Sequence, residues 1–313
     1  MLLAHFAHLG DGLELDVRLI RIPPRVVLVV LLGRVELLQR LERGHDRVLE
    51  GVTPVELPDL GFAGSPLLLT VAEGTGPGQI RDLVILNAGT AGTALNRRTG
   101  RTVWCSGTNA TAYASPMLFN SGQNACVLIF AAKHLVAVDP KDGRELWRQF
   151  WETGWDTNNS DPLIHAGRIF LSSYSRGCGL FAVESGAPRL IYTNASLCSH
   201  LSPGVVKGDY VYAFSGEAKT DTDLRCVHLP TGAVKWTRKD PAFGSLILVG
   251  DKLLVLSDKG ELLLAEASPE DFKPLARAKV LTGLCWTPPA LANGRVYVRN
   301  AKGELRCFEL GTP

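Results

Sequence analysis

The chain has 313 residues, of which 46% are apolar and 20% are charged, and its formal net charge at pH 7 is only +2. This composition is that of a folded protein with a large core, and it excludes a disordered tail. Basic residues are dispersed and form no run with interleaved aromatic residues, so we expect no nucleic-acid partner. The longest apolar run, residues 26–32, is far shorter than the roughly 20 residues that span a bilayer. We therefore expect no transmembrane segment, and because the run lacks a small-residue cleavage site it does not read as a signal peptide.

The N-terminal segment, residues 1–55, differs in composition from the rest of the chain. Its first 52 residues contain no Lys, Ser, Thr, Asn, Tyr, Trp or Cys. One interpretation is an amphipathic helix, because Val35, Leu38 and Leu41 would share one face. The other interpretation is that the segment is not native, for example the product of a shifted reading frame. In both cases we predict that it packs poorly and contributes no blade to the fold that follows.

From residue 56 to residue 313 we predict one domain, because a single pattern occurs six times between Gly61 and Leu310. Each copy has a Ser-Pro-like start, two apolar strands, and a turn that ends in an aromatic residue. The anchoring small or apolar positions are 38 to 45 residues apart and are Ala94, Ala137, Ala182, Cys226, Leu264 and Cys307. A period of about 40 to 50 residues is that of a four-stranded propeller blade. The sequence therefore predicts an all-β fold, a β-propeller of antiparallel blades, with six blades readable.

The repeated turn has its own physical signature. In the second copy, Asp139 can accept hydrogen bonds from the amides that follow it, and Gly143 supplies the positive φ of a tight hairpin. The glycines at this place in three copies are Gly100, Gly143 and Gly232. Large aromatic residues follow these turns and are predicted to fill the space between neighbouring sheets. They are Trp104, Trp147 and Trp236 in the first, second and fourth copies, with Tyr192 in a degenerate third copy.

A second series of residues marks the strand starts. Proline at a strand's first residue costs no hydrogen bond of the sheet ladder, so each pair is expected to open the innermost strand of a blade. The six pairs are Ser65-Pro66, Ser115-Pro116, Asp161-Pro162, Ser202-Pro203, Ser245-Leu246 and Pro288-Pro289.

Several longer segments carry a family resemblance. They include "NAGTAGTALNRRTGRTVW", "NNSDPLIHAGRIFLSSYSRGCGL" and "CWTPPALANGRVYVRNAKGELRCFEL". From about Gly61 onward the chain resembles the bacterial PQQ-like (pyrroloquinoline-quinone-like) β-propeller repeat proteins, a superfamily with BamB-like and quinoprotein-dehydrogenase-like members. The resemblance implies a ring of seven or eight blades that is usually exported, so we expect a periplasmic or envelope location. Because only six blades are readable, the N-terminal blades are missing or replaced, and we predict that the six leave an open arc.

The resemblance leaves two functions to compare. The quinoprotein dehydrogenases add an adjacent Cys-Cys disulfide, a Ca²⁺ site and a catalytic Asp to the propeller, at close to twice this length. No adjacent cysteine pair occurs here. We therefore expect a non-catalytic scaffold without PQQ or calcium, with an unidentified protein or small ligand as its partner. The alternative is a PQQ-dependent oxidoreductase that resembles the alcohol dehydrogenases.

A few residues remain as candidates for binding or chemistry. Four oxygen-bearing residues in one loop suit either Ca²⁺ or a turn, and they are Asp156, Asn158, Asn159 and Asp161. Cys198 and His200 would share a strand face, which suits a metal or a nucleophile, or local packing; Cys178 and Cys198 could form a disulfide. Interface hot spots favour Trp, Tyr and Arg, so candidates for partner binding at the channel mouth are Trp155, Tyr174, Arg176 and Trp286. The alternative role of these four is packing within the blades.

Overall fold

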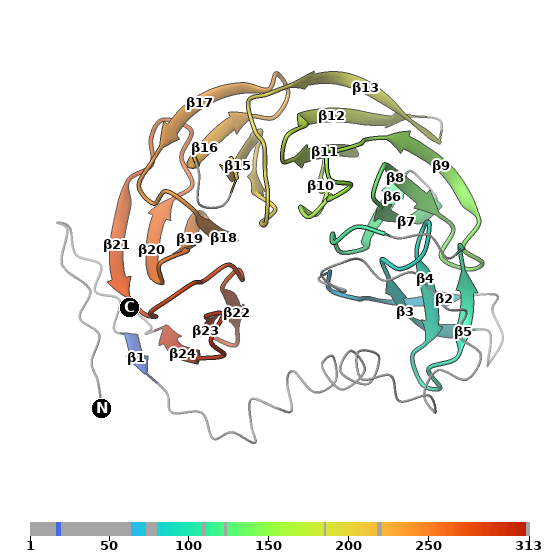
Figure 1. The fold of residues 1–313 in the computed structure, drawn as a ribbon, viewed down its shortest axis with the longest axis horizontal. Coiled ribbons are helices and arrows are strands. Elements are labelled where there is room, and N and C mark those ends of the chain that lie inside the picture. Colours follow the sequence, from blue (N-terminus) through green and yellow to red (C-terminus); the bar gives the residue numbers. More distant parts are fainter. Residues whose placement is uncertain are drawn as a thin grey trace. The chain divides into compact units, whose positions relative to one another are not determined.

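The fold consists of β-strands joined by turns and loops. The computed structural model describes residues 17–19, 64–72, 80–107, 111–121, 124–184, 186–217 and 221–310. In these ranges every regular element is a strand, and the strands form six four-stranded antiparallel sheets (Figure 1). The predicted β-propeller fold class is therefore confirmed. No helix of the described ranges is long and apolar enough to cross a membrane.

The first three sheets each contain four strands that are consecutive in the chain. Their strands are β2 (Leu67–Ala72), β3 (Ile80–Leu86), β4 (Thr93–Asn96) and β5 (Thr102–Cys105); β6 (Met117–Ser121), β7 (Asn124–Phe130), β8 (His134–Val138) and β9 (Glu145–Phe150); and β10 (Leu163–His165), β11 (Arg168–Ser173), β12 (Gly177–Glu184) and β13 (Ala187–Asn194).

The next two sheets follow the same order, and the last one does not. Their strands are β14 (Val205–Lys207), β15 (Tyr210–Ser215), β16 (Asp223–His228) and β17 (Ala233–Arg238), then β18 (Gly244–Val249), β19 (Lys252–Ser257), β20 (Glu261–Glu266) and β21 (Pro274–Lys279). The last sheet consists of β22 (Ala290–Ala292), β23 (Arg295–Arg299), β24 (Leu305–Leu310) and β1 (Val17–Leu19).

In the two sheets β14–β17 and β18–β21 the second strand is the most buried one. In β15 and β19 the five residues after the first are all buried, whereas β17 buries only Trp236. A strand with both faces covered needs a continuous apolar run instead of an alternating one. This explains why the second strands are the apolar runs that are easiest to recognise in the sequence.

The repeated turns adopt one conformation. Gly100, Gly143 and Gly232 have φ values of 72°, 73° and 70°. In the second sheet the Asp139 carboxylate accepts from the amide of Lys141 at 2.9 Å, and the Gly143 amide donates to the Asp139 carbonyl at 2.9 Å. A left-handed conformation is accessible to glycine without steric cost, so the turn requires this residue.

The three tryptophans of the repeat occupy the same register. Trp104, Trp147 and Trp236 pair with Ala94, Ala137 and Cys226, and in each sheet the register shifts directly after that position. The predicted equivalence of the three copies therefore holds in the sheets.

Three of the four large aromatic residues, Trp104, Tyr192 and Trp236, reach a connection of the sheet that follows. Trp104 Nε1 donates to the Pro140 carbonyl at 3.0 Å, and the Trp236 indole donates to the Ser268 carbonyl at 2.9 Å. The Tyr192 hydroxyl donates to the Leu229 carbonyl at 2.7 Å. These contacts join neighbouring sheets by one hydrogen bond and one packed ring.

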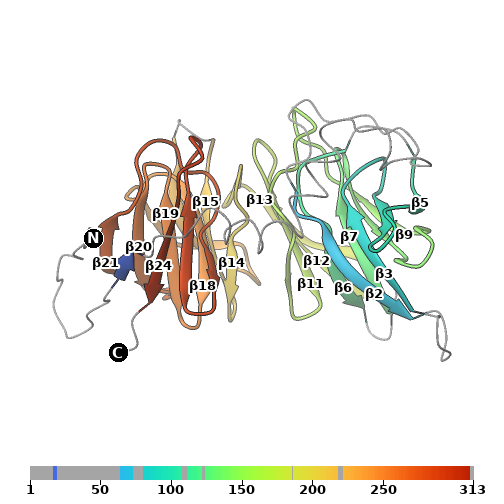
Figure 2. The same cartoon turned by 90° about the horizontal axis from the view of Figure 1, so that it is seen from below.

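By packing, the chain divides into two compact units, each described by itself below. Unit 1 consists of Met1–Ile22, Phe170–Leu180 and Tyr192–Pro313, and unit 2 consists of Pro23–Ile169 and Phe181–Ile191. Within unit 1, β14–β17 and β18–β21 share a core that includes Tyr212, Trp236, Val255 and Phe272. Within unit 2, β2–β5 and β6–β9 share a core that includes Ile85, Trp104, Ile129 and Val136. Figure 2 shows the strands of these sheets from a second side.

The strand starts lie where the sequence places them, with one exception. Pro66, Pro116 and Pro162 directly precede β2, β6 and β10. The exception is the pair Ser245-Leu246, which lies inside β18. In unit 2 the starts of consecutive sheets are also hydrogen-bonded to one another: the Ser65 amide donates to Ser115 Oγ at 3.0 Å, and the Ser115 amide donates to Asp161 Oδ1 at 2.6 Å.

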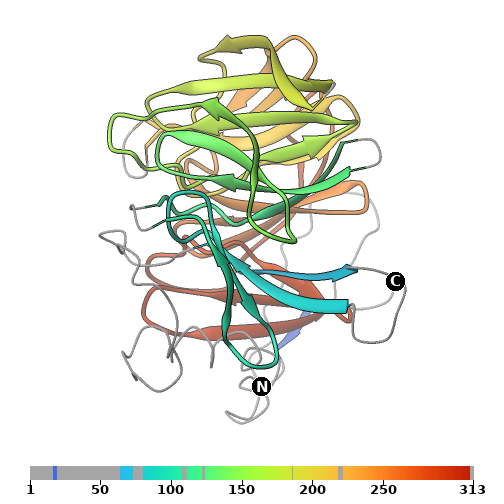
Figure 3. The same ribbon diagram turned by 90° about the vertical axis from the view of Figure 1, so that its right-hand side faces the viewer.

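The expectation that the N-terminal segment adds nothing to the sheets is wrong for Val17–Leu19. This strand, β1, pairs antiparallel with β24, with Val17 opposite Leu310 and Leu19 opposite Phe308 (Figures 1 and 3). The last sheet has three strands from the repeat region, and an uncovered edge would leave a row of unpaired backbone groups. A short segment from elsewhere in the chain can therefore supply the fourth strand. Val35, Leu38 and Leu41, the residues of the alternative helix, lie outside the described residues.

Candidate functional site

Three loops meet at one end of the sheets in unit 1. They are the β11–β12 turn, the β13–β14 loop and the β15–β16 loop. In a meander the turn after the second strand lies at the end where the first strand begins, so these three connections share one end. This is the end at which the sequence places partner-binding residues.

Backbone hydrogen bonds hold the three loops together. The Ser199 amide donates to Ser172 Oγ at 2.9 Å, which ties the β13–β14 loop to β11. The Cys198 amide donates to Ser215 Oγ at 3.0 Å, and the Gly216 amide donates back to the Cys198 carbonyl at 2.9 Å. Gly216 has a φ of 103°, and a Cβ atom there would lie 2.3 Å from the Asp221 carbonyl oxygen. Only glycine therefore permits this close approach.

One residue from each loop contributes to a polar aromatic cluster. The rings of Tyr174 and His200 stack with centroids 5.0 Å apart and planes 30° apart. The Tyr174 hydroxyl donates to Glu217 Oε2 at 3.0 Å. All three side chains are half-buried, so the cluster is held by packing and still reaches the surface. We call Tyr174, His200 and Glu217 the aromatic-acid cluster.

The protonation states of the cluster follow from its contacts. Burial lowers the pKa of His200 from its ordinary value, and the Glu217 carboxylate opposes this change. The hydrogen bond to Glu217 raises the pKa of Tyr174. Tyr174 therefore remains a hydroxyl donor at neutral pH.

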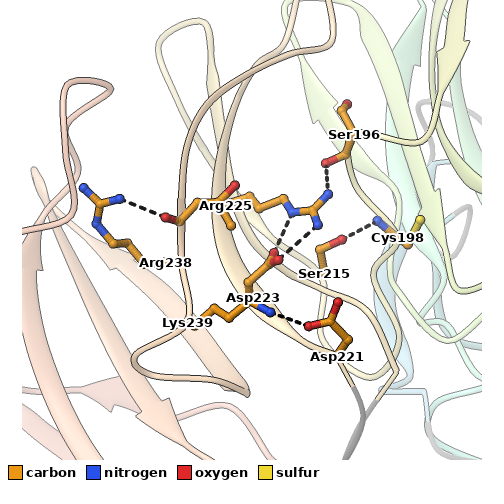
Figure 4. Close-up of polar contacts among 9 residues, drawn as sticks. Ser196, Cys198, Ser215, Asp221, Asp223, Arg225, Arg238 and Lys239 are labelled. Atoms are coloured by element: carbon orange, nitrogen blue, oxygen red, sulfur yellow. Dashed lines mark hydrogen bonds and ion pairs between the residues drawn. The ribbon is translucent and has the colours of Figure 1, made fainter.

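A bidentate ion pair supports the loop that carries His200. Arg225 Nε and Nη2 donate to the two carboxylate oxygens of Asp223 at 2.5 and 3.0 Å, and Nη1 donates to the Ser196 carbonyl at 2.8 Å (Figure 4). The side chains of Arg225 and Asp223 are only 25% and 8% exposed. The neighbouring pair, Lys239 and Asp221, is exposed. Arg225 is therefore mostly buried and connects the β13–β14 loop to β16.

Two cysteines, Cys178 in β12 and Cys198 in the β13–β14 loop, lie at this place. Both are free thiols in the structure. Cys178 Sγ lies 3.1 Å from Asn194 Oδ1, and burial raises the pKa of Cys178. Burial also raises the pKa of Cys198, although the Arg225 charge opposes it. A thiol whose pKa is raised is a poor nucleophile, so these contacts favour packing for Cys198.

The loop whose residues suit either Ca²⁺ or a turn keeps its oxygen-bearing residues apart. Asn158 is fully buried, and its Nδ2 donates to the carbonyls of Ala131 and Ala132 at 2.9 and 3.0 Å. Asp156 faces Lys133 at 3.6 Å, whereas Asp161 accepts from the Ser115 amide. Nowhere in the described ranges do three His, Cys, Asp or Glu side chains converge as metal ligands would.

The quinone cofactor of the dehydrogenases that the chain resembles needs groups that these residues do not provide. The dehydrogenases hold it with an adjacent disulfide and a calcium ion, but the seven cysteines here are single free thiols. These residues do not fit the cofactor, and we derive no reaction step through it.

The four residues proposed for partner binding have different surroundings. Tyr174 belongs to the aromatic-acid cluster, and Arg176 is exposed in the same turn. Trp286 is half-buried and packs against the core of unit 1, which agrees with its alternative packing role. Trp155 is 77% exposed and belongs to unit 2.

The sequence gives no sign of Glu217, and for His200 it suggests either a metal or nucleophilic pair with Cys198 or local packing. Glu217 lies in a short loop between two apolar strands, and no motif distinguishes it. His200 was weighed only with Cys198, two positions away. The equivalence of the β11–β12 and β15–β16 turns in the repeat is the signal that could have brought Tyr174 and Glu217 together.

Comparison with known proteins places the chain in a family. The family model described as "Outer membrane protein assembly factor BamB" matches residues 69–238, which is more than half of the chain. The chain therefore belongs to this PQQ-like β-propeller family, as the sequence predicts. A comparison with curated protein sequences finds no match.

Solved structures resemble the fold at low sequence identity. The computationally designed Ika8 protein has a TM-score of 0.56 at 10% identity, covering 82% of this chain and 74% of that one. BamB from Moraxella catarrhalis has a TM-score of 0.47 at 16% identity, covering 74% and 82%. Quinohemoprotein alcohol dehydrogenase from Comamonas testosteroni has a TM-score of 0.49 at 13% identity, covering 76% of this chain and 51% of the enzyme. This chain thus spans about half the length of that enzyme, and the similarity to Ika8 supports the fold alone.

Proposed function

We propose that this protein is a non-catalytic binding scaffold of the bacterial cell envelope, which holds a partner protein at the loop end of its sheets. The observation that carries the proposal is the aromatic-acid cluster, in which three loops present Tyr174, His200 and Glu217 in a fixed arrangement. Rigid placement of polar and aromatic groups at a surface favours binding, because little side-chain freedom is lost on association. The family description, an outer membrane protein assembly factor, supports the envelope location and a protein partner.

The same contacts support a function without a cofactor. The thiols have raised pKa values, and two carboxylates of the 156–161 loop are engaged, Asp156 with Lys133 and Asp161 with the Ser115 amide. We therefore propose that neither PQQ nor calcium binds. The exposed indole of Trp155 is available as a second contact on unit 2.

Site-specific photocrosslinking tests the partner. A photoreactive p-benzoylphenylalanine replaces Arg176, at the loop end, or Asp209, in the β14–β15 turn at the other end of the sheet that carries Glu217. Both positions are exposed, so a crosslinker at either position is equally accessible to another protein. We expect one defined protein adduct in intact cells from position 176 and none from position 209. Equal adducts from the two positions, or none from either, would contradict the proposal.

A cofactor titration tests the absence of catalysis. The purified chain is mixed with PQQ and Ca²⁺, and both calorimetry and dye reduction with simple alcohols are followed. We expect no stoichiometric heat and no quinone-dependent dye reduction. Turnover of an alcohol would contradict the non-catalytic function and support the dehydrogenase alternative.

A further inference from the structure

Two of the cysteines lie close together on neighbouring segments of unit 1. Cys178 is the second residue of β12, and Cys198 lies in the β13–β14 loop. The Leu197 amide donates to the Cys178 thiol, and the Gly177 amide donates to the Cys198 thiol. Each thiol therefore contacts the residue that directly precedes the other cysteine. A negative charge on Cys198 also contributes to the raised pKa of Cys178, which requires the two sulfur atoms to be near each other.

The backbones of the two segments are also in close contact. Gly177 has a φ of 92°, and a Cβ atom there would lie 2.3 Å from the Asn194 carbonyl oxygen and 3.4 Å from Ala195 Cα. Cys178 Sγ lies 3.6 Å from Ser196 Oγ. A disulfide needs Cα atoms about 4.4 to 6.8 Å apart, so it can join only segments that approach each other closely. The β12 start and the β13–β14 loop meet this condition.

A bond between the two sulfur atoms would leave no buried acceptor without a donor. The Cys178 thiol donates to Asn194 Oδ1 at 3.1 Å. The same oxygen accepts from the Ser196 amide at 3.0 Å and from the Ser196 hydroxyl at 2.6 Å. It therefore keeps two donors when Cys178 turns toward Cys198. The Cys198 amide donates to Ser215 Oγ, and this backbone contact does not involve the thiol.

We propose that Cys178 and Cys198 form a disulfide that fixes the loop end of unit 1 when the chain reaches an oxidising compartment. The bond would join β12 to the β13–β14 loop and close a loop of about 20 residues, which constrains the unfolded chain. The proposal rests on the proposed envelope location, because disulfides persist in the bacterial periplasm and are rare in a reducing cytosol.

The two thiols differ in access, which sets the order of the steps. Cys178 is fully buried, whereas Cys198 is half-buried and lies beside the Arg225 charge, which opposes the effect of burial on its pKa. Cys198 is therefore the thiol that meets an oxidant.

The oxidant is a disulfide carried by another protein or by a small molecule. The Cys198 thiolate attacks one sulfur of the donor disulfide, and the other donor sulfur leaves and takes up a proton. The Cys178 thiol then loses its proton and attacks Cys198 Sγ, which releases the second donor sulfur as a thiol. Two thiols of this chain are thus oxidised to one disulfide, and one donor disulfide is reduced to two thiols.

The bond has the character of a structural disulfide. Strongly oxidising catalytic pairs are easily reduced because their reduced form is stabilised. Burial raises the pKa of both thiols here, so the reduced pair gains no stabilisation from ionisation at neutral pH. We therefore expect a bond that resists reduction instead of one that oxidises other proteins.

Peptide mapping of the purified full chain tests the bond. One portion is kept in a phosphine reductant and the other in excess oxidised glutathione, and free thiols are then alkylated. Trypsin cuts after Arg176, Arg189 and Lys207, so peptides 177–189 and 190–207 carry one of the two cysteines each. We expect these peptides to be linked in most oxidised chains, with the loss of two of the seven free thiols, and unlinked after reduction. The thermal midpoint of the oxidised chain should be about 5 to 10 °C higher.

Alanine variants show which cysteines are responsible. Cys198→Ala should abolish both the linked peptides and the difference in midpoint between the two portions. Cys105→Ala replaces another half-buried cysteine, in unit 2, and should preserve both. Each variant is compared with itself under the two conditions, so a general loss of stability does not affect the result.

Three results would overturn the proposal. They are the absence of the linked peptides in oxidised chains, a link from Cys178 or Cys198 to a different cysteine, and an unchanged midpoint on oxidation. If crosslinking from position 176 still yields a partner in any of these cases, the scaffold function stands and the disulfide is wrong. If the disulfide forms as expected but no partner is crosslinked, the disulfide stands and the scaffold function is contradicted.

Discussion

The contact between Trp104 and Gly143 allows the strength of the sheet-to-sheet packing to be measured with one methyl group. An alanine Cβ at position 143 would lie 2.5 Å from Trp104 Cε3 and 2.6 Å from its Cδ2. Carbon atoms pack at roughly 3.5 to 4.0 Å, so the ring or the turn must move by about 1 Å. Overpacking of this kind costs about 1 to 3 kcal/mol. Gly143 also has a φ of 73°, and a left-handed alanine adds about 1 to 2 kcal/mol.

A second glycine of unit 2 separates the two costs. Gly167 has a φ of 71°, and no atom lies within 4 Å of the position a Cβ would take. Gly167→Ala should therefore lose only the backbone cost of about 1 to 2 kcal/mol, whereas Gly143→Ala should lose about 2 to 5 kcal/mol. The difference between the two variants is the free energy of the clash with the indole.

A double-mutant cycle gives the decisive measurement. Trp104→Ala removes the ring, at a cost of about 3 to 5 kcal/mol, and in this background Gly143→Ala should cost no more than Gly167→Ala. Urea unfolding followed by circular dichroism gives each free energy of unfolding. If Gly143→Ala costs the same with and without Trp104, the ring does not limit this turn, and the account of how the sheets are joined is wrong.

Three further changes test other contacts. Burial raises the pKa of Asp161, so its contribution to stability is present at acidic pH and is lost as pH rises through the folded-state pKa. Asp161→Asn can still accept a hydrogen bond from the Ser115 amide and should flatten this pH dependence of the thermal midpoint. A profile of thermal midpoint against pH that the variant leaves unchanged would contradict this explanation. Arg225→Met leaves the buried Asp223 unpaired and should lower the free energy of unfolding by about 3 to 5 kcal/mol, whereas Lys239→Met, in the exposed pair, should change little in urea unfolding. Deleting residues 1–22 removes β1 and uncovers β24, so we expect a lower thermal midpoint and self-association on size-exclusion chromatography; a monomer with an unchanged midpoint would show that β1 is dispensable.

The repeat was predictable because its signals are local. The turn residues Asp139 and Gly143 are four positions apart, and the aromatic residue follows within the next strand. A pattern of this length returns clearly in three copies, so its period can be read without knowing which sheets are neighbours. The same property explains why the strand starts and the register of the tryptophans were predictable.

The candidate site could not be predicted in the same way because its members are not local. Tyr174, His200 and Glu217 come from three loops on consecutive sheets, and each loop has an ordinary turn composition. The ring stacking and the hydroxyl bond arise only when β11, β15 and the β13–β14 loop lie side by side. The aromatic member, Tyr174, was a candidate because tyrosine is common in interfaces, whereas a glutamate in a short loop carries no such signal.

The N-terminal strand shows why composition alone was a poor guide to pairing. A strand that only closes an edge is held by backbone groups, which every residue except proline provides. Val17–Leu19 therefore needs none of the Thr, Tyr or Trp that the buried strands use, and three residues are too few to show a period. A segment of unusual composition can still be the fourth strand of a sheet when the neighbouring strand, β24, presents donors and acceptors along its outer edge. The skewed composition of the segment thus gives no ground for excluding Val17–Leu19 from the fold.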